Sequence, residues 1–113
     1  MPLLKVQTNI EIPPALQTSL LAQLSSTVAE ALNKPERYVM VTLETVQSML
    51  FAGSNQALAY LELKSLNLPE AETKTLSATL CSLLQQLDIQ PDRVYIEFSN
   101  AQRHMWGWNN STF

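Results

Sequence analysis

Cysteine, glycine and histidine are scarce in this chain of 113 residues, and each scarcity excludes a class of site. The single cysteine, Cys81, rules out an internal disulfide and a C-x-x-C redox pair. The two glycines, Gly53 and Gly107, leave no phosphate-cradling loop. The one histidine, His104, provides neither metal-ligand spacing nor support for a Ser-His-acid triad. We therefore expect no metal and no bound cofactor.

Charge and long apolar runs are also lacking. Charged residues make up 15% of the chain, the net charge is -3, and no basic cluster is present to attract nucleic acid. No apolar run approaches the ~18 residues of a membrane span, and no signal peptide is visible at the N-terminus. Apolar residues reach 46%, which predicts one folded domain over residues 1–113. We expect no nucleic-acid or membrane partner and a cytoplasmic location, with non-classical secretion left open.

The second residue is a proline that stands directly before a strand-like run, residues 3–8. If Met1 is trimmed, the nitrogen of Pro2 becomes a secondary amine, whose pKa lies far closer to neutrality than that of a lysine. Burial in an apolar pocket lowers the pKa of an amine further, because burial disfavours the charged form. Pro2 is therefore a candidate general base. The alternative is that Pro2 merely begins a strand, a position that proline tolerates.

The chain contains an internal repeat, of about residues 2–56 and 58–112. Residues 34–41 align with residues 90–97 through a shared Pro-acid-Arg element that an apolar, β-prone run follows. Apolar positions upstream also coincide, which indicates a duplicated unit. In each half, apolar residues at three-to-four spacing predict a helix between two strands. We expect strands at 3–8, 38–44, 57–65 and 93–98, and helices at 16–32 and 69–87.

Two strand-helix-strand units predict an α/β (α+β) fold, because a helical crossover gives right-handed, parallel pairing within each unit. The expected architecture is a four-stranded mixed sheet with two helices on one face. Segments such as residues 57–61 and 39–41 are apolar on both sides in places, so we interpret the uncovered face as buried by oligomerisation. Residues 48–53 and 104–108 are candidates for short edge strands that pair with a neighbouring subunit.

Four blocks together resemble the macrophage migration inhibitory factor (MIF) family, within the tautomerase superfamily, over the whole chain. They are Met1-Pro2, Lys34-Pro35 with Tyr38, the run Asp92–Ile96, and the tail Gly107–Phe113. The resemblance implies two βαβ units assembled as a homotrimer with active sites at the subunit interfaces. It further implies an isomerase: a keto–enol tautomerase of phenylpyruvate-like α-keto acids, and a candidate isomerase of dopachrome-type compounds.

The resemblance also implies roles for individual residues. Pro2 matches the catalytic proline, and Lys34 matches the lysine that holds the substrate carboxylate or keto oxygen. Leu66, after Ser65, matches the position whose backbone amide helps to bind substrate, and Tyr95 matches a tyrosine from the neighbouring subunit. Glu97 stands at a further substrate-binding position, where the best-known members have asparagine. From the residues themselves, the candidate pocket-lining aromatics are Tyr38, Trp106, Trp108 and Phe113, with burial in the core as the alternative.

Two departures from the family pattern bear on substrate choice. A carboxylate at Glu97 repels an anionic substrate unless it is protonated or paired with Lys34 or Arg37. Trp106 replaces a smaller apolar residue and narrows the pocket or stacks on the substrate. The alternative function is a cytokine-like signalling or binding protein that keeps the trimeric fold without essential catalysis, and a weaker one is a ferredoxin-like ligand-binding domain.

Overall fold

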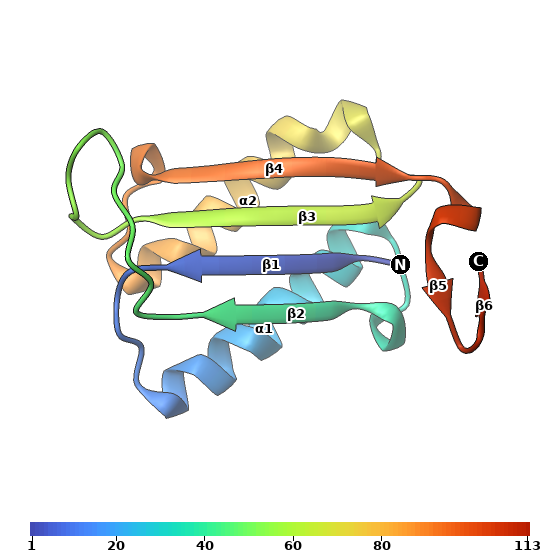
Figure 1. Ribbon diagram of the computed structural model, residues 1–113, viewed down its shortest axis with the longest axis horizontal. Coiled ribbons are helices and arrows are strands. Elements are labelled where there is room, and N and C mark those ends of the chain that lie inside the picture. The colour runs from blue at the N-terminus through green and yellow to red at the C-terminus, as the bar shows by residue number, and fades with distance from the viewer.

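Two strand-helix-strand units build the fold in the computed structural model, which describes residues 1–113 (Figure 1). The first unit comprises β1 (Leu3–Thr8), α1 (Pro14–Leu32) and β2 (Met40–Glu44). The second comprises β3 (Ala59–Leu66), α2 (Thr73–Leu84) and β4 (Val94–Ala101). The remaining elements are short: 3-10 turns η1 (Glu36–Tyr38), η2 (Glu70–Glu72), η3 (Gln85–Leu87), η4 (Pro91–Arg93) and η5 (Arg103–Met105), and strands β5 (Gly107–Trp108) and β6 (Ser111–Thr112).

The main sheet has the strand order β2-β1-β3-β4. Each unit pairs its own strands in parallel, β1 with β2 and β3 with β4, and the units join through antiparallel pairing of β1 with β3. Both helices lie behind the sheet in the view of Figure 1, so they cover the same face. The predicted α+β class, with a mixed four-stranded sheet and two helices, is confirmed.

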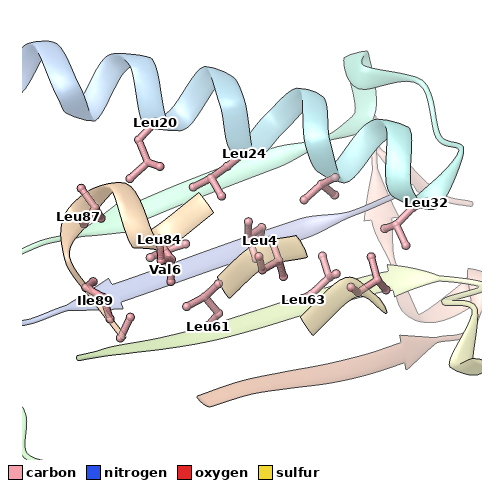
Figure 2. Packing of buried hydrophobic residues seen from close by; sticks show 14 of the residues in the cluster. Leu4, Val6, Leu20, Leu24, Leu32, Leu61, Leu63, Leu84, Leu87 and Ile89 are labelled. Atoms are coloured by element: carbon pink, nitrogen blue, oxygen red, sulfur yellow. The ribbon is translucent and has the colours of Figure 1, made fainter. Parts of the chain in front are cut away.

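The core fills the space between the sheet and the two helices. Burial alternates along β1, where Leu4, Val6 and Thr8 are buried, so one face of the strand packs against the helices. From α1, Leu20 and Leu24 pack onto that face, as Figure 2 shows. Full burial of one such leucine stabilises the fold by about 1.5–3 kcal/mol. The helical stripes of the sequence therefore become the covered side of the sheet.

The C-terminal end of α1 places Lys34. Asn33 adopts a left-handed conformation (φ 53°), and the backbone N–H of Lys34 donates to the carbonyl of Ala29 at 2.9 Å. This pattern is a Schellman-type cap, which satisfies helix carbonyls that would otherwise have no partner. Pro35 follows directly and prevents the helix from continuing. The cap therefore holds Lys34 between α1 and the start of η1.

The uncovered face of the sheet is mostly polar, so the expectation of strands that are apolar on both sides is wrong, while burial of this face by oligomerisation stays a prediction. Lys5 on β1 stands opposite Thr42 on one side and Glu62 on the other, and Glu62 stands opposite Glu97. The apolar run around Leu58 looks two-sided in the sequence because Leu58 and Ala59 are consecutive and both buried. Leu58 precedes β3, and Ala59 lies on the covered side of that strand. The large exposed apolar side chains instead lie near the sheet margins, loops and C-terminal segment: Met40, Val46, Leu50, Tyr95, Met105 and Trp108.

The two candidate edge strands fare differently within the single chain, and their pairing with a neighbouring subunit stays a prediction. Residues 48–53 form a loop with a single isolated bridge between Phe51 and Ser54. Residues 104–108 divide between η5 and β5, and β5 pairs with β6 rather than with the main sheet. Asn109 and Asn110 between them have positive φ values of 52° and 64°, as a tight two-residue hairpin of type I′ requires. The chain therefore ends in a hairpin of its own.

The buried hydroxyl of Thr8 generates a stability prediction. It donates to the carbonyl of Leu58 at 2.7 Å, at the junction between the first unit and β3. Thr8→Val keeps the shape but removes the donor to a buried carbonyl, so we expect the free energy of unfolding in urea to fall by about 1–3 kcal/mol. Thr42→Val, on the exposed side of β2, is the matched control. Equal stability of the two variants would contradict this account.

Candidate functional site

A cavity of about 460 Å³ opens at the N-terminal end of β1. Three parts of the chain form it: the residues around Pro2, the η1–β2 segment, and the C-terminal hairpin, which lies beside the N-terminus in Figure 1. Most of the lining is hydrophobic, and Arg37 is its one charged side chain. The expected residues that line it are Pro2, Tyr38, Trp106, Trp108 and Phe113.

Pro2 is buried at the head of this cavity. Its carbonyl accepts a hydrogen bond from the backbone N–H of Met40 at 3.0 Å, which continues the β1–β2 ladder by one residue. Because β1 and β3 run antiparallel and Leu3 pairs with Lys64, the next position on β3, Ser65, lies opposite Pro2. Pro2 thus lies between the ends of both neighbouring strands and is hydrogen-bonded to β2.

Three aromatic side chains form one wall of the cavity. The rings of Trp108 and Phe113 are stacked, with centroids 5.3 Å apart and planes inclined by 10°. Tyr38 meets both rings edge-on, at 5.5 Å from Trp108 and 6.0 Å from Phe113. Such edge and stacked contacts add to the stability that burial provides. The wall therefore joins η1 to the C-terminal hairpin and gives the cavity an aromatic side.

The electrostatic field at the cavity favours an uncharged amine. Partial burial lowers the pKa of the terminal amine of Met1 below its ordinary value, and the nearby positive charges of Lys34 and Arg103 lower it further. In the folded protein the amine therefore releases its proton at a lower pH than in the unfolded chain. The Pro2 nitrogen is a peptide nitrogen while Met1 is present, and it becomes the terminal amine in the same surroundings once Met1 is removed.

Lys34, Ser65 and Leu66 lie at the same end of the sheet but do not line the cavity. Lys34 is half-buried, and its charge acts on the N-terminus. Ser65 and Leu66 are buried, and the hydroxyl of Ser65 donates to the carbonyl of Leu66 at 3.0 Å. These three residues therefore lie at the cavity end of the sheet, while the aromatics form the cavity walls.

Tyr95 and Glu97 lie outside this cavity. Tyr95 pairs with Tyr60 near the start of β3, five residues before Ser65, which is about 17 Å along the strand at ~3.3 Å per residue. The ring of Tyr95 is 4.7 Å from that of Phe51, and both line a second, apolar hollow of about 260 Å³ with Leu50. Tyr95 is 66% exposed. One chain alone therefore does not bring Tyr95 to Pro2.

Glu97 is paired, but with neither Lys34 nor Arg37. It lies on the uncovered sheet face, where the hydroxyl of Tyr60 is 3.0 Å from a carboxylate oxygen of Glu97 and 3.0 Å from one of Glu62. One O–H donates to one acceptor at a time, so the two carboxylates share a single proton donor. Desolvation and these two neighbouring carboxylates raise the pKa of Tyr60 to about 12.

Arg37 is a residue of the cavity that sequence reasoning considered only as a partner for Glu97. Its guanidinium lies 4.7 Å from the centre of the Tyr38 ring. The sequence feature that could have indicated Arg37 as a cavity residue is its place between Pro35 and Tyr38, inside the turn that leads to β2. Arg93, part of the repeated Pro-acid-Arg element, has a structural task instead: its guanidinium donates to the carbonyls of Phe51, Ser54 and Gln56.

Nowhere in the chain do three or more His, Cys, Asp or Glu side chains gather in a way that holds a metal ion. No helix combines the length and apolar character needed to cross a membrane. Cys81 is half-buried on α2, and burial raises the pKa of its thiol, which disfavours the reactive thiolate.

The fold consists of two βαβ units that share one sheet, and a buried proline lies at the head of an aromatic cavity. Comparison with known proteins finds relatives of one family. The family model for macrophage migration inhibitory factor (MIF) matches residues 1–113. Macrophage migration inhibitory factor of Meriones unguiculatus is 36% identical over 115 residues, covering 100% of this chain and 99% of that protein. The homolog from Brugia malayi is 33% identical over 115 residues, which again cover 100% of this chain and 99% of that protein.

Solved structures show the same likeness. The macrophage migration inhibitory factor homologue from Prochlorococcus marinus superposes with a TM-score of 0.93 at 39% identity, over 98% of each chain. The factor from Trichinella spiralis gives 0.90 at 32% identity, over 98% of this chain and 99% of that one. The chain therefore belongs to the macrophage migration inhibitory factor family, which includes tautomerase-type and cytokine-like members.

The hydroxyl of Tyr60, which Glu62 and Glu97 share on the uncovered face, leads to a prediction about pH. Glu97→Gln removes one of the negative charges that disfavour the phenolate of Tyr60, so the pKa of Tyr60 falls from about 12 towards its ordinary value of 10.0. Carbon-13 NMR of the labelled Cζ atom of Tyr60 across an alkaline titration measures this. Glu70→Gln, an exposed change on η2, is the control. A Tyr60 pKa that is the same in wild type and Glu97→Gln would show that the pairing is absent in solution.

Proposed function

We propose that this chain is a keto–enol tautomerase of aromatic α-keto acids such as phenylpyruvate, with Pro2 as the general base and acid. The observation that carries the proposal is the burial of Pro2 at the head of an apolar, aromatic-walled cavity whose surroundings lower the pKa of an amine. Dopachrome-type compounds, which combine a conjugated ring system with a carboxylate, form a second candidate substrate class. Family membership supports both, because tautomerases are common in this family.

The proposed reaction moves one proton and needs no cofactor. The neutral amine of Pro2 takes a proton from the carbon next to the keto group, and the electron pair of that C–H bond forms the carbon–carbon double bond of an enolate. The enolate oxygen then receives a proton from the protonated amine, which returns the base to its neutral form. Lys34 binds the substrate carboxylate or keto oxygen and stabilises the negative charge on the developing enolate.

The reaction requires a free Pro2 nitrogen, and its basicity follows from the surroundings of the cavity. Desolvation already lowers the pKa of the Met1 amine, and Pro2 lines the same cavity, so we expect desolvation to act on the amine of Pro2 as well. Lys34 and Arg103 add like-charge repulsion against the protonated form. A base of lowered pKa is largely neutral at physiological pH and ready to accept a proton.

We propose further that the working enzyme is a homotrimer, whose neighbouring subunits bring Tyr95 and Glu97 to each Pro2 site. Tyr95 and Leu50 are 66% and 70% exposed in the single chain, and they belong to one apolar hollow far from Pro2. Water contact with such large apolar side chains is unfavourable, and a subunit interface relieves it. Members of this family form oligomers, which supports the assembly.

The catalytic role of Pro2 is tested by Pro2→Gly. Loss of the secondary amine lowers kcat/KM for phenylpyruvate by about 10²–10⁴-fold, the usual contribution of a positioned general base. The rate is followed by the ultraviolet absorbance of the enol, and intact-mass measurement establishes that Met1 has been removed from each protein. Pro13→Gly, an exposed change at the far end of β1, is the control. Equal rates for wild type and Pro2→Gly would refute the catalytic proposal and favour the cytokine-like binding role.

The trimer is tested at Leu50. A carboxylate there is tolerated by the single chain, because the side chain is already 70% exposed, but it is unfavourable in an apolar interface. We expect Leu50→Glu to lower the mass in sedimentation equilibrium from three chains to one and to reduce tautomerase activity with it. Ala78→Glu, on the exposed side of α2, is the matched control. A trimeric Leu50→Glu protein would place the interface elsewhere.

A further inference from the structure

Arg37 is the one charged side chain in the lining of the Pro2 cavity, and no carboxylate neutralises it. The only ion pair of the chain joins Lys64 to Glu62, on the uncovered face of the sheet. The acidic neighbour of Arg37 in the sequence, Glu36, instead accepts a hydrogen bond from the hydroxyl of Ser25 on α1 at 2.9 Å. Arg37 therefore presents an unpaired guanidinium to the cavity.

The position of Arg37 is set by the aromatic wall. Its guanidinium stacks over the ring of Tyr38, 4.7 Å from the ring centre, and Tyr38 in turn contacts the rings of Trp108 and Phe113. A cation over an aromatic face is held there electrostatically and keeps its N–H donors free at the edges of the guanidinium plane. The residue is thus placed in advance on the wall that a flat substrate would contact.

Positive charge is concentrated at this end of a chain that is negative overall. The sequence has 7 Lys and Arg against 10 Asp and Glu, yet Lys34, Arg37 and Arg103 all lie around the cavity. Lys34 and Arg103 act on the terminal amine, and Arg37 stands on the wall. One carboxylate of an α-keto acid needs only one of these cations, so the wall carries a second that the proposed reaction leaves unused.

We propose that Arg37 is a specificity-determining residue that binds a second anionic group on the substrate. The preferred substrates are then aromatic α-keto acids that bear a carboxylate on the ring, at the end away from the keto acid. The guanidinium binds a carboxylate through two parallel N–H donors, which favours this planar group over a neutral ring end. A cavity of about 460 Å³ lies in the size range of small-molecule sites and has room for the longer substrate. This inference deepens the proposed function and rests on it, because the bound acid is a substrate only if the chain is a tautomerase.

Binding is measured first, with ligands that do not tautomerise. The chain has two tryptophans, Trp106 and Trp108, and both line the cavity, so intrinsic fluorescence reports on this site. Wild type is titrated with 3-phenylpropanoate and with 3-(4-carboxyphenyl)propanoate. We expect the dicarboxylate to bind at least fivefold more tightly, and we expect Arg37→Gln to abolish that preference. Arg37→Lys keeps the charge without the planar fork and retains part of it.

A control variant separates local from general electrostatics. Lys74→Gln removes one positive charge at an exposed position on α2, outside the cavity lining. It leaves the ratio of the two dissociation constants unchanged if Arg37 acts by direct contact. An equal preference for the dicarboxylate in wild type and Arg37→Gln, or its loss in Lys74→Gln as well, would overturn the assignment.

Turnover distinguishes this inference from the proposed function. With phenylpyruvate and 4-carboxyphenylpyruvate as substrates, Arg37→Gln lowers the ratio of their kcat/KM values at least fivefold, mainly through KM for the dicarboxylate. If wild type shows the binding preference but converts neither compound, the tautomerase proposal fails and the anion site stands. If wild type converts both with equal kcat/KM and binds both analogues equally, the tautomerase proposal stands and the role of Arg37 is refuted.

Discussion

The pairing of β1 on both of its edges is the constraint on which the rest of the molecule depends. Leu3 stands between Met40 of β2 and Lys64 of β3, so the first strand of the chain is a central strand of the sheet. Its covered side supplies Leu4 and Val6 to the core, and its first residue adjoins Pro2. A proline lacks the N–H that a central ladder requires, and it fits here because the ladder ends at this point. The same pairing that builds the core therefore sets the position of the candidate base.

Much of the fold could be predicted from the sequence, because periodicity reports directly on burial. The helical spacing of Leu20, Leu24 and Val28 marks the face of α1 that packs on the sheet, and these residues are fully buried. The polarity of the open face was missed because an apolar run around Leu58 looks two-sided in sequence. The C-terminal hairpin was missed because strands of two residues have no periodicity to detect.

The candidate site, too, could be predicted from the sequence only in part. Pro2 was a candidate from its position and chemistry, the resemblance supported it, and the fold brings it together with the aromatics of the tail at one cavity. Their closeness is a tertiary effect, since the hairpin reaches Tyr38 across the end of the sheet. The direction of Glu36 towards α1, which leaves Arg37 unpaired, depends on side-chain contacts that no spacing rule specifies. Tyr95 lies about 17 Å along the strand from the Pro2 end, so a single chain can reveal it only as an exposed ring.

The central place of β1 has a consequence for biosynthesis. This strand leaves the ribosome first, yet its partner on one side, Lys64, is made some sixty residues later. Until β3 has emerged, the nascent first half exposes an unpaired strand edge and an incomplete core, and pairing over such a separation is slow. The N-terminus consequently stays open to processing enzymes during translation, before the fold encloses Pro2. Delayed closure of the sheet thus provides a time window in which Met1 can be removed.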